Sequence, residues 1–214
     1  VISEAFSNAV ITPGETTTED VIWWMRQRVQ DLGYQVWFQP SVDVSRQGSG
    51  RIRESTVIQP GDLLWTDFGV VAMNLHTDTQ HLGYVLKPGE SEPPAGLQAC
   101  LGDSNRMQDM LMAEMEPGRT GNDILASTLQ RMSCEGITGT VYTHPIGDHG
   151  HVPVRGDAVL LPSTWHSIEL QATRAIPEWD GEQANCRQEE EAYLDENGER
   201  HWVFRRQENF HLIW

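Results

Sequence analysis

The chain has 214 residues and a formal net charge of −16, and Lys87 is its single lysine. Its length and hydrophobic content suffice for one compact core, while no run approaches the roughly 20 apolar residues of a membrane span and no signal-peptide pattern opens the chain. The acidic surface would repel phosphates, which disfavours nucleic acid as a partner. Three widely spaced cysteines without a Cys-x-x-Cys motif fit a reducing compartment. We therefore expect a soluble, cytoplasmic protein with no nucleic-acid or membrane partner.

The first part of the sequence predicts two helices followed by a strand. Residues 1–10 show helical spacing of apolar side chains and begin abruptly, so we expect that upstream sequence is missing. Residues 16–19 have the form of a capping box, and one apolar face continues from there until Gly33 ends the helix. Residues 35–42 favour a short strand that ends near Pro40, and residues 43–56, rich in Ser, Gly and Arg, favour a loop.

Two aspartates lie in a segment otherwise rich in strand-forming residues. If residues 62–71 and 77–86 pair as an antiparallel ribbon that turns near residues 72–73, Asp67 and Asp78 lie directly opposite each other on one face. Like charges in that position repel, and a divalent cation bound by both carboxylates would relieve the repulsion. The alternative is that both side chains are solvated on the outer face of a hairpin, and their spacing alone leaves both interpretations open.

The rest of the chain predicts a helical hairpin and then more strands. Residues 95–115 and 122–133 carry apolar side chains at helical intervals on either side of a Pro-Gly turn. Short strand-like runs follow at 138–143, 158–161, 165–172, 186–195 and 200–205. Strands before and after a helix pair indicate one α+β domain, whose sheet is built from both halves of the chain.

Histidines and further acids gather in the last third of the sequence. His144, His149 and His151 lie on a short Gly-containing stretch, which suits metal ligation or proton transfer, although a surface loop that is merely rich in histidine is the alternative. Glu169 is a single acid among apolar neighbours in a predicted strand. Residues 189–191 are three consecutive glutamates, for which a solvated charged face is the ordinary interpretation.

Taken in order, these motifs resemble those of the M24 metallopeptidases, the pita-bread family of Xaa-Pro aminopeptidases, prolidases, methionine aminopeptidases and creatinase. The resemblance covers essentially the whole chain, and five ordered matches are more specific than any one of them. The matching sequence segments are Gly-Asp-Leu-Leu-Trp-Thr-Asp67-Phe-Gly, Thr-Asp78-Thr-Gln, His144-Pro-Ile-Gly-Asp-His149-Gly-His, Ser-Ile-Glu169-Leu and Glu189-Glu190-Glu191-Ala-Tyr.

The resemblance implies a pita-bread fold, a curved antiparallel sheet flanked by helices, with residues 1–214 as a single catalytic domain and no separate N-terminal domain. It also implies a binuclear metal centre. Its ligands would be Asp67, Asp78, His149, Glu169 and Glu190. His149 is preferred to His144 because Gly follows it directly, and Glu190 is preferred to Glu189 by its place before the Ala-Tyr strand, a choice that leaves Glu189 open.

The family's chemistry needs two divalent ions, and Mn²⁺ is expected for this branch, with Co²⁺, Fe²⁺ or Zn²⁺ as alternatives. A water held between two such ions ionises near neutral pH and attacks the scissile carbonyl. By resemblance, Glu190 and His144 would take part in catalysis, and His144 and His151 would hold the substrate.

The expected activity is that of an aminopeptidase that removes the N-terminal residue of short Xaa-Pro peptides, and a homodimer is expected because dimers are common in the family. A catalytically silent metal-binding interaction module, or a non-peptidase hydrolase or lyase on the same scaffold, are the alternatives.

The sequence departs from the family pattern in three places. We expect no counterpart of the N-terminal domain that most Xaa-Pro aminopeptidases and prolidases carry. Residues 44–59 contain no histidine, although a histidine commonly precedes the first metal strand, and the loop after His149 is short. These departures leave the expected metal ligands in place but remove groups that hold substrate, so hydrolysis is better supported than specificity for proline.

Overall fold

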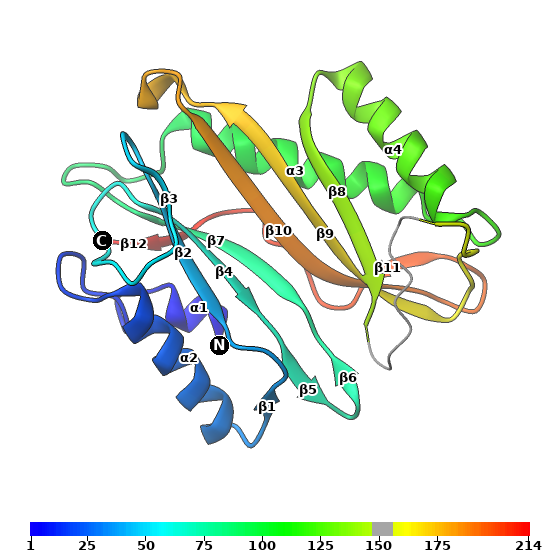
Figure 1. Ribbon diagram of the computed structural model, residues 1–214, viewed down its shortest axis with the longest axis horizontal. Coiled ribbons are helices and arrows are strands. Elements are labelled where there is room, and N and C mark those ends of the chain that lie inside the picture. Colours follow the sequence, from blue (N-terminus) through cyan, green and yellow to red (C-terminus); the bar gives the residue numbers. More distant parts are fainter. Residues whose placement is uncertain (147–155) are drawn as a thin grey trace.

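The computed structural model describes residues 1–146 and 156–214. Within these ranges a nine-stranded sheet, twisted along its length, forms the centre of the fold (Figure 1). The strand order is β3, β2, β4, β7, β10, β9 and β8, and in addition β11 pairs with β10 and β12 runs parallel to β7. The strands are β2 (Ser41–Arg46), β3 (Gly50–Ile52), β4 (Leu63–Phe68), β7 (Thr79–Val85), β8 (Thr138–Pro145), β9 (Thr164–Ala175), β10 (Gln183–Leu194), β11 (Arg200–Trp202) and β12 (His211–Ile213).

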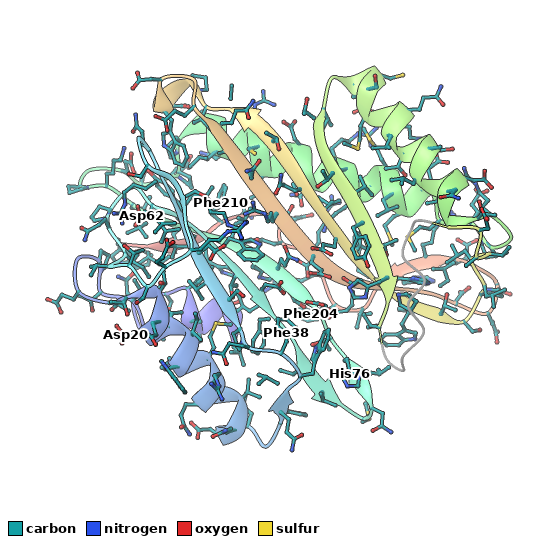
Figure 2. The ribbon with its side chains drawn as sticks, viewed as in Figure 1. Asp20, Phe38, Asp62, His76, Phe204 and Phe210 are labelled. Atoms are coloured by element: carbon teal, nitrogen blue, oxygen red, sulfur yellow. The ribbon has the colours of Figure 1, made fainter. Side chains whose placement is uncertain are left out.

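A smaller three-stranded sheet extends the ribbon made by β4 and β7. It contains β1 (Gln35–Val36), β5 (Val70–Ala72) and β6 (Leu75–His76). Met73 and Asn74 connect β5 to β6 with positive φ values of 51° and 65°, the backbone signs of a type I′ hairpin turn. In Figure 2, Asp62 at the start of β4 and His76 on β6 mark opposite ends of this ribbon.

Helices pack on the two halves of the sheet. One hydrophobic core joins β9 and β10 to α3 (Ala95–Glu114) and α4 (Gly121–Glu135), and the other joins β2 and β4 to α1 (Ile2–Ala5) and α2 (Thr18–Asp31). A short 3₁₀ helix, η1 (Pro177–Trp179), connects β9 to β10. None of the described helices is long and apolar enough to cross a membrane.

The seam between the two half-sheets, where β7 meets β10, is narrow. A single residue pair, Gln80 opposite Glu189, is in register across it. Next to this pair the side chain of Gln207 takes the place of a strand partner: its Oε1 accepts the Leu82 N–H at 2.8 Å, and its Nε2 donates to the Leu82 carbonyl at 2.6 Å. The two halves therefore approach most closely around Glu189.

The three longer predicted helices and the α+β class are confirmed, with small differences in detail. The capping box of α2 uses Thr17 and Asp20, one residue later than predicted. The predicted strand at 35–42 is present as β1, which ends before Pro40 as expected. The predicted loop at 43–56 is wrong, because this polar segment forms most of the β2–β3 hairpin. Residues 158–161 form only an isolated bridge, and β12 was not predicted.

Candidate metal centre

Asp67 and Asp78 share one face of the ribbon, but they are not directly opposite each other. Asp67 lies on β4 across from Gln80 of β7, so the predicted register is wrong by two residues. The reason is the turn, which is centred on Met73 and Asn74, one residue later than predicted. Because the difference is an even number, Asp78 stays on the face of Asp67, close enough for the Asp67 charge to help raise the pKa of Asp78.

The other half of the sheet supplies Glu169 and Glu189, which are direct partners across β9 and β10. Successive residues of a strand point to opposite faces, so Glu189 faces Glu169 while Glu190 points away. The Glu190 carboxylate instead accepts a hydrogen bond from the Gln207 backbone at 2.7 Å and contacts His81 Nε2 at 2.9 Å, and it lines a separate cavity of about 740 Å³. Glu189, rather than Glu190, is therefore the glutamate that lies with Asp78 and His144 among the described residues, and the identity of the metal ligand stays a prediction.

His144 completes the group. It lies near the end of β8, and its Nε2 is 3.3 Å from Glu189 Oε1 and 3.7 Å from Asp78 Oδ2. Asp78, His144 and Glu189 each offer a ligand atom within 4.8 Å of those of the other two, a spacing that a single metal ion can bridge. We call Asp67, Asp78, Glu169 and Glu189 the acidic cluster.

Hydrogen-bond donors hold the innermost member of the acidic cluster. Glu189 is 1% exposed, and its Oε1 accepts a hydrogen bond from Ser167 Oγ. The amide nitrogen of Gln80 donates to Glu189 Oε2 at 2.6 Å and to Glu169 Oε1 at 2.8 Å. Each carboxylate oxygen has two lone pairs, so these bonds orient the groups and leave lone pairs for a cation.

Without a cation, three members of the acidic cluster, Asp67, Asp78 and Glu189, favour the protonated form. Burial, with further contributions that include the charges of Glu169 and Glu189, raises the pKa of Asp67 to about 6 and the pKa of Asp78 to about 10. Burial also raises the pKa of Glu189 well above its ordinary value, with the Glu169 charge acting in the same direction. A group of carboxyls that cannot all ionise together needs a positive charge among them.

The donor set fits divalent cations. Asp67 Oδ1 and Asp78 Oδ1 are buried and have no hydrogen-bond partner among the described residues, which is costly for carboxylate oxygens unless a cation completes their coordination. Oxygen-rich sites with one imidazole suit Mn²⁺ and related ions. Four carboxylates would balance the charge of two divalent ions.

Two of the predicted residues, His149 and His151, lie outside the described residues. Glu191, the third glutamate of the run, is close to the acidic cluster without joining it: its Oε1 accepts the backbone N–H of Asp78 at 2.8 Å. Burial raises the pKa of Glu191 as well.

Three residues around the acidic cluster were not predicted from the sequence: Gln80, Trp65 and Arg187. Each lies two positions along the chain from a member of the acidic cluster. Side chains two residues apart on a strand lie on the same face of the sheet, and this alternation is the signal that could have revealed them. Arg187 stacks over the Trp65 ring at 5.4 Å and has no carboxylate partner among the described residues. Burial and the nearby Arg51 lower the pKa of Arg187 to about 10.

Comparisons with known proteins bear on the family and the fold. The model of metallopeptidase family M24 matches residues 1–194, and no curated protein sequence matches the chain. The structure resembles an X-Pro aminopeptidase from Thermotoga maritima (TM-score 0.78, 18% identity, 99% of this chain and 58% of that one) and an Xaa-Pro dipeptidase from Bacillus anthracis (0.73, 18%, 99% and 59%).

It also resembles a methionine aminopeptidase from Thermotoga maritima (TM-score 0.65, 19% identity, 91% of this chain and 87% of that one). The chain thus spans little more than half of the first two proteins. These similarities confirm the predicted pita-bread fold.

Proposed function

Because this chain belongs to metallopeptidase family M24, we propose that it is a metal-dependent exopeptidase that removes the N-terminal residue from short peptides, with Xaa-Pro peptides as its substrates. One observation carries the proposal. Two acids from each half of the sheet, with His144, converge at the seam, and the raised pKa values of Asp67, Asp78 and Glu189 call for positive charge among these acids.

The proposed ligands are the acidic cluster and His149, with two Mn²⁺ ions as the cofactor. Glu189 would replace Glu190 in the ligand set, because Glu189 lies opposite Glu169 and with Asp78 and His144. Divalent ions held there would supply an ionised water at neutral pH and polarise a scissile carbonyl.

The chain's own residues would then bind and orient the peptide. His144 contacts Asp78 and Glu189 and is placed to hydrogen-bond the carbonyl oxygen as it gains negative charge. Arg187 lies on the Glu189 face two residues away and can pair with a free carboxylate at the C-terminus of a short peptide. Such a pairing favours dipeptides and tripeptides over internal segments of proteins.

The test is a turnover assay on chelator-treated protein reloaded with Mn²⁺. The substrates are Xaa-Pro dipeptides and tripeptides, with Xaa-Ala peptides of the same length for comparison. Wild type should release the N-terminal residue, Asp78→Ala should not, and Asp31→Ala, which changes an exposed acid at the end of α2, should behave as wild type. Release from Xaa-Ala but not Xaa-Pro peptides would overturn the proline specificity, and metal uptake without any peptide cleavage would overturn the peptidase activity.

A further inference from the structure

Gln80 occupies the one position at which the two half-sheets are in register. It lies on β7 opposite Glu189 of β10, and it lies opposite Asp67 of β4 on its other side. Its side chain is 3% exposed. A buried amide at this point contacts acids contributed by both halves of the fold.

The orientation of this amide is fixed by Trp65. The indole Nε1–H can only donate, and it donates to Gln80 Oε1 at 3.0 Å. The amide nitrogen must therefore face the other way, where it donates to Glu169 Oε1 at 2.8 Å and to Glu189 Oε2 at 2.6 Å. Both N–H bonds of the amide are used, one on each glutamate.

We propose that Gln80, locked by Trp65, is a positioning residue that holds Glu169 and Glu189 in the geometry that binds the metal ions. The inference rests on the proposed function for its metal site. A neutral double donor draws two repelling carboxylates together without adding a charge that competes with the cation. It also occupies one lone pair on each glutamate, so the remaining lone pairs have a defined direction.

The proposal is tested by treating the otherwise intact chain with a chelator and then measuring its binding of Mn²⁺ by calorimetry. Gln80→Met keeps the length of the side chain but removes both donors, and the Mn²⁺ dissociation constant should rise by about 10- to 100-fold. Trp65→Phe frees the amide to rotate, so the dissociation constant should rise in the same direction by a smaller factor.

Gln108→Met is the matched control. Gln108 is also fully buried, on α3, but its amide atoms have no hydrogen-bond partner among the described residues. The Gln108→Met variant should bind Mn²⁺ with the affinity of the wild type. If thermal unfolding shows Gln80→Met and Gln108→Met to be folded and both bind Mn²⁺ with wild-type affinity, the proposal is wrong.

A second variant tests the direction of the amide. Gln80→Glu replaces the donor with a fifth acid, so Mn²⁺ binding should weaken as it does in Gln80→Met. Binding as tight as wild type would instead identify position 80 as a direct oxygen ligand, and would overturn the positioning role. Failure of the proposed function has a different signature, since wild type would then bind Mn²⁺ in a Gln80-dependent way without cleaving any peptide.

Discussion

Replacement of Asp78 by Asn should stabilise the metal-free protein and abolish its stabilisation by metal. The pKa of Asp78 is raised from 3.8 to about 10, chiefly by burial and then by the charges of Glu189 and Asp67. At pH 7 the folded chain therefore retains a proton that the unfolded chain releases. One pKa unit corresponds to about 1.4 kcal/mol, so this carboxyl lowers the free energy of unfolding by up to about 4 kcal/mol at pH 7.

The effect has a definite pH dependence. Below about pH 4 the carboxyl is protonated in both states and the penalty vanishes. As the pH rises above the unfolded-state pKa, the metal-free wild type loses stability, and Asp67, whose pKa is about 6, adds to the loss over the lower part of that range. Asn keeps an N–H donor for Asp67 but has no proton to lose, so Asp78→Asn should lack this part of the decline.

Urea unfolding in the presence of a chelator, at pH 4 and at pH 7, measures the difference. Asp78→Asn should exceed wild type by about 2–4 kcal/mol at pH 7 and match it at pH 4. Asp31→Asn, at an exposed site, should match wild type at both. Saturating Mn²⁺ should reverse the order at pH 7, because ligands stabilise only the state that binds them. Equal stabilities of wild type and Asp78→Asn at pH 7 without metal would refute the reasoning.

Three further predictions follow from the same contacts. Glu189→Gln should weaken Mn²⁺ binding, measured by calorimetry, at least about tenfold. Glu190→Gln, on the opposite face of the sheet, should leave the Mn²⁺ affinity nearly unchanged. A larger loss of affinity in Glu190→Gln than in Glu189→Gln would identify Glu190 as the ligand. Gln207→Met leaves the buried N–H and C=O of Leu82 without partners and should lower the free energy of unfolding by about 2–4 kcal/mol in urea; a change below about 0.5 kcal/mol would mean that water replaces the amide. Arg187→Met should raise KM about 10- to 100-fold for a dipeptide with a free carboxylate, the loss of one charged hydrogen-bonded pair, but not for the same dipeptide amidated; equal effects on both would exclude the carboxylate role.

Much of the fold was accessible from local patterns, and the errors have physical causes. The helices α2, α3 and α4 carry apolar faces that the sequence displays directly, and α2 and α4 also begin with capping boxes. The β2–β3 hairpin was missed because its polar Ser, Gly and Arg residues resemble a loop, and β12 was missed because its three residues become a strand only by pairing with β7. Strand existence in such short segments is decided by tertiary partners.

In the candidate site, too, some features follow from local sequence patterns and others depend on tertiary structure. The acids were found from the order of their motifs, but the face on which each lies depends on strand register, which the sequence does not display. Register places Glu189, rather than Glu190, opposite Glu169, and it places Gln80, rather than Asp78, opposite Asp67. The donors around Glu189 could be found only once β7, β9 and β10 were aligned.

The most direct measurement is the divalent-metal content of the folded protein by elemental analysis, after purification without chelator and equilibration with Mn²⁺. We expect two Mn²⁺ ions per wild-type chain and fewer in Glu189→Ala, with both proteins folded by circular dichroism. A folded wild-type chain that retains no divalent metal would contradict the convergence of these side chains on bound cations.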